Sequence, residues 1–526
     1  MKRGNVIILI LALLIMLVSC GGNDKKIEEK KNEVVFANFR DIRDLNPHNY
    51  AGELYAQNML YEGLVKINPE GEIIPWLAEK WEITDDGKSY TFFLRKDVVF
   101  SDGEKFNAKA VKANFDAIMD NKERHGWLES VRLFEKFEEV DEYTFRLTLK
   151  EPYFPMLTEL GVIRPFRFIS PKAMKNGTTK NGVDGKYIGT GPYVLKQNAV
   201  DQEAVFEVNE KYWGEKPKIK TVRVKVIPDV NTRSMALEKG ELDIIFGRDM
   251  IDAETVNRFE DKKGFKVKLS EPLATRMLMV NTTKGVLKDK KVRQALQHVI
   301  DKKAVSEGIF SGIEAPADTL FSKNIPYADI NLKPYGYSLE MAGKLLDEAG
   351  WKPGKDGKRE KEGKNLVITL NYDSDSVSEK SISEYFKDQL NKIGVELKIA
   401  GEEEQSNRDR KNKGDFEITF ATSWGTPYDP ISFLGAMTHF PGHGEYMAQR
   451  GLPNIDEMNR EILEALKTTD ENKRKETFTK VFTILHDEGV YIPLTYEKNR
   501  VIYKEILKNV EFEISPYEIP FYMMSY

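Results

Sequence analysis

Cysteine is almost absent from this chain of 526 residues, which has only Cys20. If that residue is modified, disulfide bonds, thiolate metal sites and cysteine nucleophiles are all excluded. Any metal chemistry must then use histidine, methionine or carboxylates. Histidine is scarce too, because the chain has only six.

The chain also lacks a large excess of charge of either sign, and it lacks long apolar runs after its N-terminal segment. The 79 basic and 84 acidic residues nearly cancel, and no long basic run follows the N-terminal segment, which argues against nucleic acid binding. After residue 20, no stretch approaches eighteen consecutive apolar residues, so no membrane-spanning helix is predicted there. A chain of this length can build two or three lobes, each with its own core.

Recognised catalytic motifs are absent as well: G-x-S-x-G, H-E-x-x-H, Walker A and the dinucleotide glycine motif do not occur. The segment Gly189-Thr190-Gly191-Pro192 resembles a phosphate loop. Pro192, however, removes an N–H donor and a strand is expected to follow, so we interpret the segment as a tight turn. The run Glu402–Glu404 is interpreted as a solvated surface. We therefore predict that the chain is not an enzyme, and a surface hydrolase is the weakest alternative.

The N-terminus has the pattern of a targeting segment. Lys2 and Arg3 precede an apolar run of thirteen residues, Val6–Val18, which ends in the sequence LVSCG. This pattern is typical of bacterial lipoproteins, whose cysteine carries a lipid. We predict that residues 1–19 are removed, that Cys20 is lipidated and that residues 20–33 form a flexible tether. An unlipidated signal peptide is the alternative. The expected location is the cell envelope, outside the cytoplasm, and the membrane that bears the anchor stays open.

Hydrophobic periodicity predicts alternating strands and helices. Residues 55–106 read as helix, turn, helix and hairpin, with a further helix at 108–120. Further strands are expected at 34–39, 143–149, 189–196, 222–228, 242–245, 277–281, 366–371, 394–399, 416–421, 491–496 and 501–503. Further helices are expected at 232–239, 291–300, 338–349, 381–393, 456–467 and 472–489.

This order predicts an α/β protein of two lobes. We place the first lobe, with an extra subdomain, at residues 34–274, the second at 275–497, and a return to the first at 498–526. Two lobes joined by more than one crossing strand form a hinged clamp, and the cleft between them is the expected ligand site.

His439 and His443 have the spacing of two metal ligands on one helix turn. Pro441 and Gly442 stand between them, so we expect no helix in this stretch and no two-histidine site. His443 lies between two glycines, where the backbone can reach into a cleft. It is either a metal ligand or an ordinary surface histidine, and we assign His439 no metal role.

Longer segments carry a family resemblance. The chain has a lipoprotein signal, "YEGLVKINPEGEIIPWLAEKWEITDDGKSY", "GTGPYVL" and "KVRQALQHVIDKKAV". With these it resembles the extracellular solute-binding proteins of family 5, which serve ABC importers for peptides and for nickel. The resemblance covers residues 34–526. It implies a two-lobed periplasmic-binding-protein fold of class II, cluster C.

Local stretches resemble the nickel-binding subgroup: "LNPHNY", "RHGWLE", "IRPFRF", "GEEE", "SWGTPYDP", "HGEYMAQRGLP" and "YEIPF". The resemblance implies a lipid-anchored, monomeric binding protein without an intrinsic cofactor. It would capture Ni²⁺ held by an organic chelator and deliver it to ABC permease subunits. The residues to which the resemblance assigns the site are His443 for the metal and Arg164, Arg124, Tyr50, Trp127, Trp424 and Tyr428 for the chelator.

The residue types suit these roles. Imidazole suits Ni²⁺, and one histidine suffices if a chelator fills the other positions. The guanidinium of Arg164 can bind a carboxylate, although a structural salt bridge is the alternative. The aromatic side chains can stack on a flat chelate, although in most proteins they would be core residues. His48, His125, His298 and His486 are interpreted as structural or surface residues.

Departures from the subgroup leave the chelator open. Leu54 stands where we expect a methionine facing the metal complex, and Tyr517 replaces a smaller hydroxyl residue. The chelator is then free histidine or a larger, opine-type metallophore. A di- or oligopeptide is the second hypothesis, with Asp429 as the candidate partner for the peptide's amino group. Cobalt and zinc also remain open as alternatives to nickel.

Overall fold

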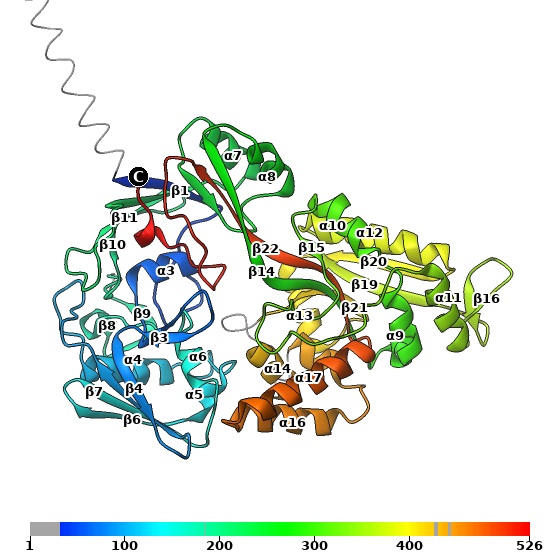
Figure 1. The fold of residues 1–526 in the computed structure, drawn as a ribbon, viewed down its shortest axis with the longest axis horizontal. Coiled ribbons are helices and arrows are strands. Elements are labelled where there is room, and N and C mark those ends of the chain that lie inside the picture. The colour runs from blue at the N-terminus through cyan, green and yellow to red at the C-terminus, as the bar shows by residue number, and fades with distance from the viewer. Residues whose placement is uncertain (1–31, 185, 425–429, 440–442) are drawn as a thin grey trace, which may run out of the picture.

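The computed structural model describes residues 32–184, 186–424, 430–439 and 443–526. The predicted signal peptide, Cys20 and most of the predicted tether therefore lie outside the described residues. Two α/β lobes stand side by side and are joined by a pair of long strands (Figure 1). Within the described ranges, no helix combines the length and the apolar character needed to cross a membrane.

An eleven-stranded mixed sheet runs through both lobes, in the order β10-β11-β12-β1-β13-β22-β14-β21-β19-β20, with β15 beside β22. The first-lobe strands are β1 (Glu33–Asn38), β10 (Tyr193–Ala199), β11 (Glu203–Val208), β12 (Thr221–Val226) and β13 (Ile244–Phe246). The second-lobe strands are β15 (Ala315–Pro316), β19 (Val367–Asp373), β20 (Glu396–Glu402) and β21 (Ile418–Thr422). Strands β14 (Phe265–Val280) and β22 (Tyr491–Lys504) belong to both lobes.

The pairing between the two crossing strands, β14 and β22, is irregular in the middle of β14. Its pairing with β22 shifts register between Leu269 and Pro272 and again between Pro272 and Ala274. Proline has no N–H to donate, so the ladder is interrupted and the strand can bend there. The lobe boundaries drawn from the sequence, 274/275 and 497/498, fall within these two strands, and we keep that division as a proposal.

Three regions of helix and small sheet surround the main sheet. The first lobe has α3 (Leu54–Leu60), α7 (Val230–Glu238), α8 (Ala253–Glu260), the 3-10 helices η1 (Pro171–Ala173) and η3 (Phe521–Met523), and the pairs β2 (Val65–Ile67) with β3 (Ile73–Pro75) and β8 (Met174–Lys175) with β9 (Thr178–Val183). Its subdomain has β4 (Ala78–Ile83), β5 (Ser89–Leu94), β6 (Phe134–Asp141), β7 (Thr144–Leu149), α4 (Ala108–Met119), α5 (Glu129–Leu133) and α6 (Met156–Leu160). The second lobe has η2 (Gly285–Lys288), α9 (Lys290–Gln297), α10 (Lys302–Phe310), α11 (Leu339–Glu348), α12 (Val377–Lys392), α13 (Glu404–Lys413), α14 (Pro430–His439), α15 (Gly444–Gln449), α16 (Ile455–Lys467), α17 (Glu471–Asp487) and the small strands β16 (Lys352–Pro353), β17 (Arg359–Lys361) and β18 (Lys364–Asn365).

Each region is packed around apolar side chains. In the subdomain, Phe115 on α4 stacks on Phe145 of β7 with ring centroids 5.3 Å apart, and both are buried. Helix α4 begins where the Asn107 side chain accepts from the Ala110 N–H, as an N-cap residue does. In the second lobe, Leu278 and Ile368 belong to one buried cluster with helices α9 to α12.

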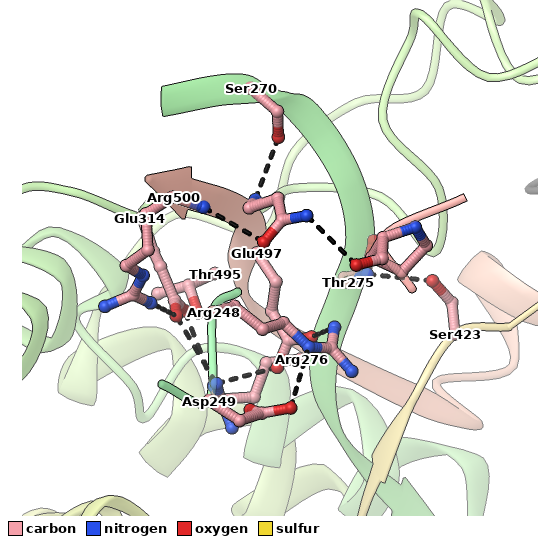
Figure 2. Close-up of polar contacts among 12 residues, drawn as sticks. Arg248, Asp249, Ser270, Thr275, Arg276, Glu314, Ser423, Thr495, Glu497 and Arg500 are labelled. Atoms are coloured by element: carbon pink, nitrogen blue, oxygen red, sulfur yellow. Dashed lines mark hydrogen bonds and ion pairs between the residues drawn. The ribbon is translucent and has the colours of Figure 1, made fainter. Parts of the chain in front are cut away.

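A buried ion network ties the crossing strands together (Figure 2). Arg276 on β14 bonds Glu497 on β22 at 2.7 Å and Glu314 beside β15 at 3.4 Å. Arg500 bonds Glu314 at 3.3 Å, and Arg248 bonds Glu497. Removal of one member would leave a buried charge uncompensated, so we expect a change at any one of these residues to destabilise the crossing.

Four sequence expectations need correction. The expected second helix within residues 55–106 is instead β3 and β4, because the segment pairs with its neighbours in hairpins. The stretch that contains His439 and His443 is helical on either side of Pro441, because α14 ends at His439 and α15 begins at Gly444, but His443 itself is extended and shares no helix with His439. Glu33, which we placed in the tether, is the first residue of β1 and pairs with Thr221 of β12. The two strands expected at 491–496 and 501–503 form a single strand, β22.

Candidate ligand site between the lobes

A cleft of about 710 Å³ lies between the lobes, and side chains from both lobes line it. The predicted site residues found on its wall are Tyr50, Leu54, Trp127, Arg164, Trp424, His443 and Tyr517. Tyr428 and Asp429 lie outside the described residues. A second hollow of about 730 Å³ shares Ile67 and Ile514 with the cleft, so the space between the lobes extends beyond one small chelate.

Tyr50 is held by two polar neighbours. The indole Nε1 of Trp127 donates to the Tyr50 hydroxyl at 2.7 Å. The same hydroxyl lies 2.8 Å from Nδ1 of His125. Because the hydroxyl accepts from Trp127, we assign its proton to the bond with His125. Burial, followed by the charge of Arg124, lowers the pKa of His125 to about 4, so its ring is neutral and can accept. Tyr50 is thereby fixed against the cleft.

Arg164 faces the cleft from the first lobe. It donates to the Gly52 carbonyl at 3.0 Å, and its guanidinium lies 5.1 Å from the centre of the Tyr50 ring. Burial lowers its pKa from the usual value, but a guanidinium remains charged at neutral pH. Arg164 makes no ion pair in the described part of the chain. The salt-bridge alternative therefore has no support there, and an anionic ligand would complete the site.

Arg124 occupies a different position. Its guanidinium lies 5.5 Å from the centre of the Tyr50 ring, yet the residue is exposed and does not line the cleft. It sits in the turns between α4 and α5, where hydrophobic periodicity does not set the direction of a side chain. Arg124 does not contact the cleft, but its charge interacts with the Tyr50 ring and lowers the pKa of His125.

His443 and Trp424 form the second-lobe wall. Trp424 follows the end of β21, and His443 precedes the first residue of α15 in an extended conformation. Their ring centroids are 6.1 Å apart. Trp424 donates to Glu445 at 2.9 Å, and Nδ1 of His443 lies 4.0 Å from the other oxygen of Glu445. One carboxylate thus orients the indole and lies near the imidazole, as an outer partner of a metal-binding histidine does.

Gly444 packs closely against a side chain of β14 where the histidine loop meets that strand. A Cβ at this position would lie 2.7 Å from the terminal methyl group of Met279, which also lines the cleft. We missed Met279 in the sequence because it belongs to a buried strand, and burial alone does not tell which strand residues face a cavity. A thioether therefore faces the cleft even though Leu54 stands where we expected a methionine.

Lysine and arginine side chains on α13 were missed as well. Arg408, Lys411 and Asn412 line the cleft from the second lobe. The sequence signals for this helix are Glu403 as its N-cap and basic residues in its last turn. We had interpreted Glu402–Glu404 only as a solvated run, although Glu402 bonds Arg410 at 2.7 Å.

Two buried carboxyl groups, Glu513 and Glu518, lie on the first-lobe side of the cleft. Lys66 bonds Glu513 at 3.0 Å and also donates to Tyr522. Glu518 faces the cleft, where burial raises its pKa to about 7 with help from Glu513. Lys66, which is itself a lining residue, is therefore held by Glu513 and Tyr522 and is not available as Arg164 is.

The remaining histidines with described side chains have structural partners. His48 is buried between the Thr179 hydroxyl at 2.8 Å and the Arg167 carbonyl at 3.1 Å. His298 bonds the Gly336 carbonyl, and His486 bonds the Lys333 carbonyl. Among the described residues there is no group of three or more His, Cys, Asp or Glu side chains that could hold a metal ion.

Gly189 and Gly191 pack against the end of α3 rather than around an anion. A Cβ on Gly189 would lie 2.0 Å from the Leu60 carbonyl oxygen, and one on Gly191 would lie 2.6 Å from the Met59 carbonyl oxygen. The Gly191 N–H donates to Leu60. The segment thus makes a close backbone contact, which only glycine permits.

Comparisons with known proteins agree with this architecture. Residues 72–444 match the model of the bacterial extracellular solute-binding proteins, family 5 middle. The nickel-binding periplasmic protein of Escherichia coli K12 is 41% identical over 485 residues, which cover 91% of this chain and 92% of that protein.

Two solved structures extend the comparison. The crystal structure of NikA from Brucella suis in complex with Fe(III)-EDTA has a TM-score of 0.91 and 43% identity, over 94% of this chain and 99% of that chain. NikZ from Campylobacter jejuni in complex with Ni(L-His) has a TM-score of 0.78 and 25% identity, over 94% and 100%. The chain belongs to the family 5 bacterial extracellular solute-binding proteins, and it is a transport binding protein rather than an enzyme.

Proposed function

We propose that this protein captures a nickel ion already held by an organic chelator and delivers it to the permease of an ABC importer. The observation that carries the proposal is the composition of the cleft. His443 and Arg164 line one cavity, while the described residues contain no group of three metal-ligating acidic, histidine or cysteine side chains. Such a site needs a metal that brings its own ligands.

The residues on each wall of the cleft fit a site in which the chelator supplies most of the metal ligands. The imidazole of His443 can fill one coordination position of Ni²⁺, and the chelator fills the others. Arg164 can bind a chelator carboxylate through a charge-assisted hydrogen bond. The rings of Tyr50, Trp127 and Trp424 can cover the flat face of the chelate and exclude water. Because Cu²⁺ binds nitrogen and oxygen sites more tightly than Ni²⁺ does, selectivity for nickel would come from the shape of the chelate.

Closure of the lobes would hold the chelate. The lobes touch away from the crossing strands, where the Phe154 N–H donates to the Leu466 carbonyl at 2.9 Å and Lys467 bonds Glu151 at 2.9 Å. Ligand contacts from both walls would favour this closed arrangement over an open one. We propose that the permease docks on the closed form, and that the protein acts as a monomer.

The membrane attachment is part of the proposal. Cys20, which lies outside the described residues, would carry a lipid after removal of residues 1–19 and would hold the protein outside the cytoplasm. Mass spectrometry of the protein from its native membrane would find an acylated N-terminal cysteine. A mature chain that begins elsewhere, or that has an unmodified Cys20, would contradict this attachment.

The function is tested by calorimetric titration of the purified protein with Ni²⁺, with and without excess free L-histidine. We expect tight binding only when the chelator is present. If neither titration gives heat, the histidine chelate is wrong, and opine-type metallophores and short peptides become the next ligands to titrate. Equal binding of Ni²⁺ alone would contradict the chelate mechanism. Parallel titrations with Co²⁺ and Zn²⁺ measure the metal preference.

A further inference from the structure

One carboxyl group on the first-lobe wall of the cleft has no bonded partner among the described residues. Glu518 lines the cleft, and only 7% of the residue is exposed. Its backbone N–H donates to the Ser515 carbonyl, yet no hydrogen bond or ion pair joins its side chain to another described residue. A polar group that is removed from water without a partner is destabilising. The position of Glu518 therefore points to a partner that enters the cleft from outside.

The charged groups that act on Glu518 have partners of their own. Glu513 repels a negative charge on Glu518, and Glu513 is itself held by Lys66 at 3.0 Å. Lys66 and Arg167 attract a negative charge on Glu518, but neither forms an ion pair with it. The Arg167 guanidinium instead donates to the carbonyls of residues 161 and 162. The described residues thus act on this carboxyl group only at a distance, and its oxygens are left for a ligand.

Glu518 changes its protonation near neutral pH. Burial, followed by the charge of Glu513, raises its pKa to about 7. At pH 7, roughly half of the ligand-free molecules therefore carry a proton on this carboxyl group. A ligand group that donates a hydrogen bond to the ionised form stabilises that form and displaces the proton. Binding of such a group at Glu518 is then coupled to the release of a proton.

Arg164 gives the same wall a group of the opposite charge. It lines the same cleft from the same lobe as Glu518. A guanidinium suits a carboxylate of the ligand, whereas a carboxylate suits an N–H donor. An amino acid chelator offers both groups, because a primary amine that coordinates a metal through its lone pair keeps two N–H donors. The two side chains therefore match the two kinds of polar group on one amino acid chelator.

We infer that Glu518 recognises the amine of the bound chelator: its carboxyl group gives up a proton to the solvent as the chelate binds, and the carboxylate accepts a hydrogen bond from an amine N–H. The inference rests on the proposed function and deepens it, because it assigns the amine of the chelator to a residue. The protons balance, since the amine keeps its own hydrogens and the proton that leaves is the one that Glu518 carried.

The first test counts protons. Calorimetric titrations of Ni²⁺ with excess L-histidine at pH 7, in buffers with different enthalpies of ionisation, measure the protons released for each chelate bound. Protons released by the chelator and by His443 are common to all the proteins, so the difference between the wild type and Glu518→Gln isolates Glu518. We expect the wild type to release about half a proton more than Glu518→Gln.

Glu505→Gln is the matched control for the proton count. Glu505 is an exposed glutamate of the same C-terminal segment, and it does not line the cleft. It should therefore release as many protons as the wild type and bind nickel–histidine with the same affinity.

The second test changes the chelator. N,N-Dimethyl-L-histidine keeps the carboxylate and the imidazole of L-histidine but has no amine N–H. We expect the wild type to bind its nickel chelate about tenfold more weakly than nickel–histidine, the effect of one charge-assisted hydrogen bond. Glu518→Gln should show a smaller preference, about threefold or less, because its amide carries no charge. A clash of the methyl groups would instead weaken binding to all three proteins equally.

Equal proton release by the wild type and Glu518→Gln, or the same preference between the two chelators in both proteins, would overturn the role of Glu518. The proposed function would stand in that case, because nickel–histidine still binds. Failure of the wild type to bind any nickel chelate would overturn both. Equal affinity of the wild type for the two chelators would also overturn the role of Glu518, and this comparison holds even if Glu518→Gln does not fold. Unchanged thermal unfolding of each variant would confirm that it is folded.

Discussion

The indole Nε1 of Trp127 donates to the Tyr50 hydroxyl at 2.7 Å, and this bond joins two distant segments of the first lobe into one wall of the cleft. The hydroxyl continues to His125, which is buried. Two aromatic faces are therefore set in position before any ligand arrives. Such preorganisation lowers the cost of ordering side chains on binding.

Replacement of Tyr50 by phenylalanine should test this arrangement. The variant loses the acceptor for Trp127 and the partner of His125, so we expect the free energy of unfolding to fall by about 1–3 kcal/mol. Chelate binding should weaken several-fold, because the indole is no longer oriented. Urea denaturation and calorimetry measure the two effects. The control is Tyr143→Phe, since the Tyr143 hydroxyl makes no hydrogen bond among the described residues. If both variants behave alike, Tyr50 does not organise the wall.

The two arginines near Tyr50 should differ in their effect on binding. Arg164 lines the cleft and lacks an ion pair in the described chain, whereas Arg124 is exposed and off the wall. We expect Arg164→Gln to weaken the nickel–histidine chelate by about tenfold to a hundredfold, because a charge-assisted bond is lost. Arg124→Gln should weaken it only a few-fold, through a screened charge. Titration of both variants at low and high salt measures this difference, and equal losses would contradict the placement of Arg164.

The ion network between the crossing strands should dominate the stability of the hinge. Glu497 is buried and bonds both Arg276 and Arg248. The change Glu497→Gln leaves both guanidinium groups undercompensated, so we expect a loss of about 3–5 kcal/mol in the free energy of unfolding. The control Glu307→Gln removes an exposed pair with Lys303 and should cost less than about 0.5 kcal/mol. A small loss for Glu497→Gln in urea denaturation would show that the network is not structural.

Glu62 predicts a pH dependence of stability. It accepts from Nε1 of Trp213 at 2.9 Å and from Tyr212, and burial raises its pKa to about 7 from a usual value near 4.5. The folded state therefore binds the proton more tightly than the unfolded chain does. Its contribution to stability is present below about pH 4.5 and is lost as the pH rises through 7, by up to roughly 3 kcal/mol.

The variant Glu62→Gln cannot ionise, so the difference in unfolding free energy between it and the wild type isolates this carboxyl group. Between pH 5 and 8 the wild type should lose stability relative to the variant. Denaturation curves at several pH values measure that difference. A constant difference across this range would contradict the raised pKa.

Much of the fold could be predicted from hydrophobic periodicity. The segments at 291–300, 366–371 and 472–489 are helix, strand and helix as expected, because each has an apolar face that the sheet or its neighbours bury. The segment that contains β4 misled us, since its apolar residues also fit a helix. Pairing with β5 decided the outcome, and such tertiary pairing overrides local preference.

The residues of the site were harder to predict from the sequence than the fold was. Local resemblance named Arg164, Trp127 and His443, which line the cleft. It also named Arg124, which the turn after α4 directs away from the wall. Lys411 was missed because α13 is polar on nearly every side and buries only Asn407, so no periodicity marks the face that lines the cleft. Contact across a cleft depends on how two lobes are placed, and a local pattern does not contain that information.

The most direct measurement of the central claim compares wild type, His443→Ala and His439→Ala in calorimetric titrations of Ni²⁺ with excess L-histidine. Quenching of Trp424, whose ring lies 6.1 Å from that of His443, offers a second readout of bound nickel. We predict that His443→Ala loses tight binding and quenching, while His439→Ala keeps both. Undiminished binding by His443→Ala, or equal losses in the two variants, would contradict a metal site built on His443.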